Sequence, residues 1–147
     1  MPENAVYKYS LKREKVCAIR EGSQLSSPEI VAEYIRATGI ASEEQEHLIT
    51  LVLDTKNQIR GYYTVVIGLA DQAVAHVREV FRYAIIQNAS AIILSHNHPS
   101  QHVEPSFDDV RLTTDMKDAA KIIGIKLLDH IIVSETSYFS FREKHMI

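Results

Sequence analysis

Residues 95–109 carry three histidines and three carboxylates directly after a short apolar run. His96 and His98 are two positions apart, and side chains at that spacing in an extended segment point the same way. Asp109 lies in the first turn of an expected helix, from which the loop can fold it back against both rings. Two imidazole nitrogens and one carboxylate oxygen, with water in a fourth position, form the donor set of a catalytic zinc ion. The spacing therefore predicts a Zn²⁺ site made of His96, His98 and Asp109.

The same residues also have a purely structural interpretation. Ser106-Phe-Asp-Asp109 is a capping-box pattern, in which a serine caps a helix and an acid three residues later bonds back to it. A His-x-His pair at a surface is commonly two solvated side chains, and His102 is either a surplus ligand or a solvated loop histidine. The spacing leaves these alternatives open.

These side chains need a strand before them and a helix after them. Apolar residues 90–95 predict a buried strand, and Ser106 opens a helix that Gly124 ends. The core-facing positions of that helix are Leu112, Met116, Ala119, Ala120 and Ile123. The other expected elements are a Lys-rich strand around Cys17, a helix over 28–38, strands over 47–53 and 58–68, a helix over 78–88, and strands over 126–134 and 137–142. This order predicts one mixed α/β domain, with a mixed sheet flanked by helices.

The composition of the chain argues against several classes of protein and of metal site. The chain has 147 residues, 46% of them hydrophobic, which is enough for the core of one domain. One cysteine excludes a disulfide framework and a thiolate-rich zinc cluster. The sequence has no signal-peptide pattern and no apolar run of membrane-spanning length, so we expect a cytoplasmic protein. A net charge of −3 argues against strong nucleic-acid binding.

Several motifs together resemble the bacterial RadC-like branch of the JAB/MPN domain family, whose members carry the JAMM metalloprotease motif. The likeness covers about residues 27–147 and leaves 1–26 as an N-terminal extension. The motifs are His96-Asn-His-Pro-Ser100, Pro105-Ser106-x-x-Asp109, Leu-Leu-Asp-His-Ile-Ile-Val at 127–133, Ser-Pro-Glu at 27–29, Gln45-Glu46-His47, Leu53-Asp-Thr-Lys-Asn57, Arg78-Glu-Val-Phe81 and Tyr138-Phe-Ser-Phe141.

The resemblance implies a cytidine-deaminase-like fold and a zinc-dependent peptidase or isopeptidase that uses a zinc-bound water. His96, His98 and Asp109 match the zinc ligands of the family. Ser106 matches the serine that stabilises the oxyanion, and Glu46 matches the upstream catalytic acid. Pattern alone gives Glu46 no role, because a glutamate beside a strand is by default solvated. The strand alternation places His130 with Leu128 and Ile132 on one face, as a core histidine or one that supports a ligand, and Asp129 on the other.

The chain departs from the family in three places. Asn97 stands where the deubiquitinating members usually have a small hydroxyl residue, so the substrate does not follow from those relatives. Gln101 and His102 stand where RadC-like members commonly have a glycine after the serine. Residues 1–26 are too short for the helix-hairpin-helix module of longer members.

Three functions remain open: a zinc hydrolase, a DNA repair or recombination accessory of the RadC type, and a catalytically silent interaction domain. We favour the hydrolase because the whole ligand set is present together with Glu46 and Ser106. The expected partner is a peptide or protein substrate, with no strong nucleic-acid binding and no membrane. A homodimer is left open.

Overall fold

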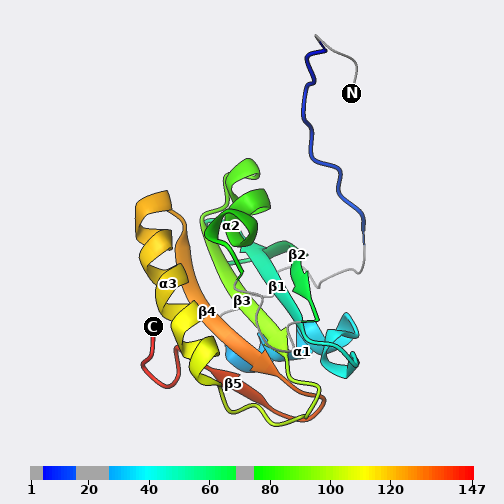
Figure 1. The fold of residues 1–147 in the computed structure, drawn as a ribbon, viewed down its shortest axis with the longest axis vertical. Helices are drawn as coiled ribbons and strands as arrows, with labels where there is room; N and C mark the ends of the chain where they lie inside the picture. Colours follow the sequence, from blue (N-terminus) through cyan, green and yellow to red (C-terminus); the bar gives the residue numbers. More distant parts are fainter. Residues whose placement is uncertain (1–4, 16–26, 69–74) are drawn as a thin grey trace.

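A five-stranded mixed sheet forms the centre of the protein. The computed structural model describes residues 5–15, 27–68 and 75–147. The strands are β1 (His47–Leu53), β2 (Ile59–Ile67), β3 (Ala91–Asn97), β4 (Lys126–Val133) and β5 (Tyr138–Ser140). Their order is β2-β1-β3-β4-β5, and only the β3–β4 pair is parallel (Figure 1). The chain therefore has the predicted mixed α/β fold.

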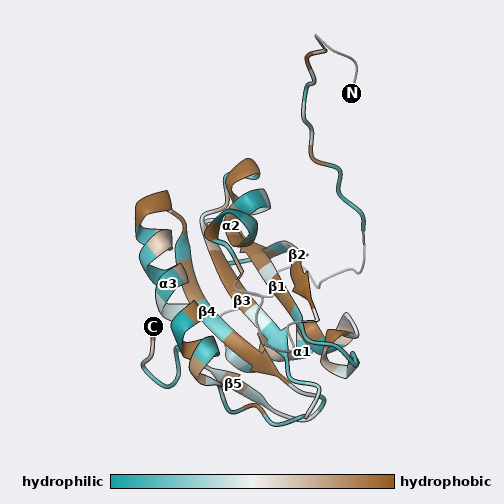
Figure 2. Cartoon of the chain, viewed as in Figure 1, coloured by the Kyte–Doolittle hydropathy of each residue, from teal (hydrophilic) through white to brown (hydrophobic). Residues whose placement is uncertain are grey.

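Helices cover both faces of the sheet, because the central strands are apolar on both sides. One face packs against α1 (Pro28–Ala37) and the short helix η1 (Ile40–Ser42). The other packs against α2 (Val77–Ile86) and α3 (Phe107–Ile123). Figure 2 shows hydrophobic residues along most of the central strands and a largely hydrophilic outer side on α3. Within the described ranges, no helix is both long and apolar enough to cross a membrane.

Local capping residues explain where the helices α1 and α3 begin and where α3 ends. Ser27 caps α1 by accepting a hydrogen bond from the Ile30 amide, and Pro28 occupies the first helical position. Ser106 caps α3, and Gly124, with a φ of 81°, ends it in the left-handed conformation. The predicted core positions of α3 are buried or packed against the core.

A β-bulge in β4 contradicts the expectation that Leu128 lies on the same face of the strand as His130. Ile92 of β3 pairs with Leu127, but Ile93 pairs with Asp129, so Leu128 is an extra residue in β4. Leu128 consequently packs on the α1 face and does not share a face with His130. An extra residue reverses the alternation of the strand beyond it. Regular alternation from Leu127 would put His130 under α1, whereas the bulge turns it toward α3.

Element boundaries differ from the predictions by a few residues. β3 continues through His96 and Asn97, because these residues pair with Leu48 of β1 and Val133 of β4 respectively. α2 runs from Val77 to Ile86 and β5 covers only three residues. Residues 5–15 contain no helix or strand. The strand expected around Cys17 lies outside the described residues.

Candidate metal centre

Two histidines meet at the C-terminal end of β3. His96 is the sixth residue of this central strand, and its side chain is 1% exposed beneath α3. His98 follows two residues later, and its Nε2 lies 3.0 Å from Nε2 of His96. The Nδ1 atom of His98 is 2.7 Å from the backbone carbonyl of His102 and donates to it. That bond leaves the Nε2 atom of His98 turned toward His96, as the alternation of the strand predicts.

Asp109 joins the two histidines from the first turn of α3. Its Oδ1 lies 3.2 Å from Nε2 of His96, and its Oδ2 lies 3.3 Å from Nε2 of His98. The same carboxylate completes the capping box: Oδ2 accepts from the Ser106 amide at 2.8 Å, and the Asp109 amide donates to Oγ of Ser106 at 3.1 Å. The capping and ligand interpretations of Asp109 are therefore compatible, because one carboxylate serves both.

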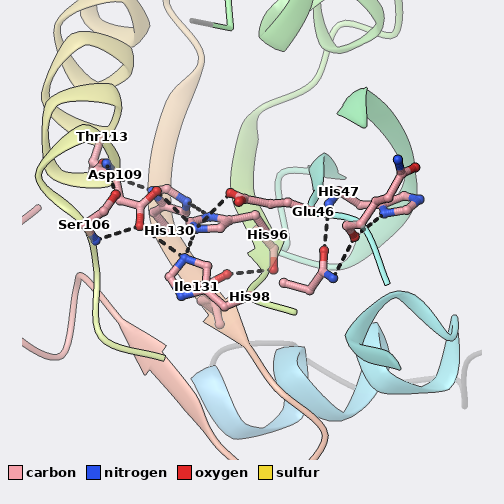
Figure 3. Close-up of polar contacts among 12 residues, drawn as sticks. Glu46, His47, His96, His98, Ser106, Asp109, Thr113, His130 and Ile131 are labelled. Atoms are coloured by element: carbon pink, nitrogen blue, oxygen red, sulfur yellow. Dashed lines mark hydrogen bonds and ion pairs between the residues drawn. The ribbon is translucent and has the colours of Figure 1, made fainter. Parts of the chain in front are cut away.

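Glu46 reaches the cluster from the segment before β1. Its Oε1 lies 3.7 Å from Nε2 of His96 (Figure 3). Its backbone carbonyl accepts a hydrogen bond from the Gly68 amide at 2.8 Å. The side chain of Glu46 is 23% exposed, so this side of the cluster is open to solvent.

Asn97 holds the segment that carries Glu46, a role that the sequence did not suggest. Its Oδ1 accepts from the His47 amide at 2.7 Å, and its Nδ2 donates to the carbonyls of Gln45 and Glu43. The amide is fully buried and satisfies backbone groups on both sides of Glu46. The signal for this role is a polar residue at the end of an apolar strand, although sequence alone gives no partner for it.

The four donors suit a metal ion. One ligand atom from each of Glu46, His96, His98 and Asp109 can be chosen so that all lie within 4.8 Å of one another. Ligand atoms about 2.0 Å from a tetrahedral ion lie about 3.3 Å from each other. The spacings among His96, His98 and Asp109, 3.0 to 3.3 Å, are close to that value. Two imidazoles and carboxylates are also a donor set that zinc accepts.

Burial and hydrogen bonding shift the pKa values of Glu46, Asp109 and His98 in different directions. Burial raises the pKa of Glu46, against the lowering effect of His96 and His98. Burial alone would raise the pKa of Asp109, but hydrogen bonds with both histidines hold it well below its usual range. The hydrogen bond with Asp109 raises the pKa of His98. The Asp109 carboxylate therefore stays charged to lower pH than the Glu46 carboxylate, which accepts a proton more readily.

His130 and Thr113 lie directly behind His96. His130 is completely buried, which lowers its pKa well below the usual value. Its Nε2 lies 2.8 Å from Nδ1 of His96, and its Nδ1 lies 2.6 Å from Oγ1 of Thr113. The prediction that His130 belongs to the core or supports a ligand is confirmed. Thr113 was not predicted, because nothing in its helical position distinguishes it from a core residue.

Two other predicted features lie outside the cluster. The side chain of His102 is exposed and is not among the grouped donors, and only its backbone carbonyl contacts His98. Asp129 faces the α1 side, where it accepts from the amides of His130 and Arg142 and from the Ser140 hydroxyl.

Gln101 adopts a φ of 66°, in the region that favours glycine, and its side chain bonds Ala41 and Glu135.

Comparisons with known proteins identify the relatives of this chain. The chain matches the family model of the RadC-like JAB domain over residues 25–146. Three curated relatives, each described as a UPF0758 protein, come from Chlorobium luteolum, Chlorobium phaeovibrioides and Chlorobaculum tepidum, at 48%, 45% and 44% identity. Each alignment covers 80% of this chain and 52% of the relative. The chain thus spans about half the length of the curated relatives it matches.

Proposed function

We propose that this chain, which belongs to the RadC-like JAB domain family, is a zinc-dependent hydrolase that cleaves a peptide or isopeptide bond. The observation that carries the proposal is the convergence of Glu46, His96, His98 and Asp109 within 4.8 Å. These residues come from three separate chain segments. Two of the four, His96 and Asp109, are buried, so the donors converge at a largely enclosed place.

The ligands in this proposal are His96, His98 and Asp109. A zinc ion held by them would supply Lewis-acid chemistry, polarising a carbonyl and making a water more acidic. Glu46 is the proton carrier: its carboxylate takes a proton from the attacking water and gives it to the leaving nitrogen as the C–N bond breaks and the C–O bond forms. The raised pKa of Glu46 suits this exchange.

Ser106 stabilises the carbonyl oxygen in the same proposal. Its Oγ accepts a hydrogen bond from the Asp109 amide, so that bond does not use the hydroxyl proton. The proton can point toward a carbonyl oxygen placed over the cluster and donate to it as negative charge develops there. The expected substrate of this hydrolase is a peptide or protein. It would enter from the open side of the cluster, beside Glu46.

Elemental analysis tests the metal. Protein purified after growth with zinc should hold about one zinc per chain. His98→Ala should empty the site, because it removes one of the ligands, while His47→Ala should not, because His47 lies beside Glu46 but outside the cluster. A folded wild-type chain without zinc would contradict the proposal and favour a catalytically silent domain.

A further inference from the structure

A chain of short hydrogen bonds runs from α3 through β4 to the innermost candidate ligand. The Thr113 hydroxyl donates to the Asp109 carbonyl at 2.7 Å and lies 2.6 Å from Nδ1 of His130. The Nε2 atom of His130 lies 2.8 Å from Nδ1 of His96. Figure 3 shows these contacts between Thr113, His130 and His96. The three residues are each no more than 2% exposed, so the bonds are shielded from solvent.

The direction of the first bond determines the direction of the others. A threonine hydroxyl has one proton, and a backbone carbonyl can only accept. Because Thr113 donates to Asp109, its oxygen must accept from Nδ1 of His130. A neutral His130 then has no proton on Nε2, which must accept from Nδ1 of His96. With its proton on Nδ1, a neutral His96 presents a free lone pair on Nε2 to the other donors.

The opposite direction would disable His96 as a ligand. If Thr113 donated to His130 instead, Nε2 of His130 would donate to Nδ1 of His96, and the proton of His96 would sit on Nε2. That nitrogen faces Asp109 and His98, where a metal would have to bind. The Thr113–Asp109 bond favours the first arrangement. In the metal-free chain the Asp109 carboxylate, 3.2 Å from Nε2 of His96, favours a proton on that nitrogen, which a metal ion would displace.

Two features of the fold aim His130 at His96. The bulge at Leu128 reverses the alternation of β4 and so turns His130 toward α3. The ring then stacks on Phe141, with centroids 4.8 Å apart and planes 9° apart. His130 has little freedom to turn away from His96.

We propose that His130, oriented by Thr113, is a positioning residue that fixes His96 in the tautomer whose Nε2 can bind a metal. The proposal rests on the proposed metal site but concerns residues that do not touch the ion. Hydrogen-bond partners of this kind orient metal-binding histidines, and their loss typically lowers metal affinity by roughly 10- to 100-fold.

Zinc affinity, measured by competition with a chromophoric chelator, is the first test. His130→Phe should weaken zinc binding by roughly 10- to 100-fold, because a ring of similar shape keeps the stacking but offers no acceptor. His130→Gln should recover part of the loss, because its amide oxygen can accept from Nδ1 of His96. Thr113→Val should also weaken binding, whereas Thr50→Val should not. Thr50 is a matched control, since its buried hydroxyl donates to the Val80 carbonyl of α2 and not to a residue of the cluster.

Proton–nitrogen correlation NMR of the metal-free wild type is the second test, and it needs neither zinc nor a substrate. Nδ1 of His96 should carry a proton that is donated to His130, and Thr113→Val should lower the occupancy of that proton. Wild type that binds zinc no better than His130→Phe, or a His96 ring without a proton on Nδ1, would overturn the inference. Wild type that shows the expected tautomer yet binds no zinc would instead overturn the proposed function.

Discussion

The proposed function gives the two carboxylates of the candidate site different tasks because their surroundings differ. The Asp109 carboxylate contacts both histidines and accepts a hydrogen bond from the Ser106 amide of its own helix turn, so its charge is held. Glu46 is farther from His96, 3.7 Å against 3.2 Å, and is half-buried at the open side. An acid–base site needs two groups with different pKa values. One group then keeps its charge while the other can exchange a proton.

Replacing Glu46 by glutamine should therefore separate chemistry from metal binding. The amide is nearly isosteric but cannot take a proton, so turnover should fall by roughly a hundredfold or more while zinc content and the melting temperature stay near wild type. The measurement requires a substrate found with wild-type protein in peptide and isopeptide panels. Glu44→Gln is a matched control, because Glu44 belongs to the same segment but is exposed.

Two outcomes would contradict this assignment. Full activity in Glu46→Gln would make Glu46 an ordinary residue at the start of β1. Loss of zinc together with activity would make it a ligand.

At the scale of elements, the N-terminal turn of α3 carries both a cap and a candidate ligand. Ser106→Ala should cost about 1 kcal/mol of folding free energy through the lost cap. Because the cap also fixes the turn that carries Asp109, the variant should weaken zinc binding severalfold. Urea unfolding of the metal-free protein and chelator competition measure the two effects.

Ser27→Ala is the matched control for that variant. Ser27 caps α1 through the Ile30 amide, on the other face of the sheet. It should lose similar stability and keep wild-type zinc affinity. Equal zinc affinity in both variants would mean that Asp109 does not depend on the cap.

The elements were predictable where one local pattern determines them. Caps and apolar spacing were enough for α1 and α3, and continuous apolar runs for β1 and β3. The bulge at Leu128 was not predictable, because its cause is the pairing of β4 with β3 and not a local signal. The contacts of Asn97 and Thr113 were missed for the same reason, since each partner lies on another segment or another element. Glu46 came from the family resemblance alone.

At the scale of the whole molecule, sheet order brings the candidate site together. β1 and β4 are the two neighbours of β3, so Glu46 before β1 and His130 on β4 both lie beside His96. α3 then crosses the same face and adds Asp109 and Thr113. The site uses most of the fold, so metal binding should stabilise the whole fold and not one loop.

The stabilisation by zinc should depend on pH. The hydrogen bond with Asp109 raises the pKa of His98, so in metal-free protein this pair stabilises the fold fully below about pH 6.5 and is lost as pH rises through the raised pKa. Zinc needs the unprotonated ring, so the zinc-induced rise in melting temperature should be small at about pH 5 and large at about pH 8. His102→Ala should keep this dependence, whereas His98→Ala, which empties the site, should show no zinc-induced rise at either pH. An equal rise at both pH values in wild type would mean that zinc does not displace a proton from His98.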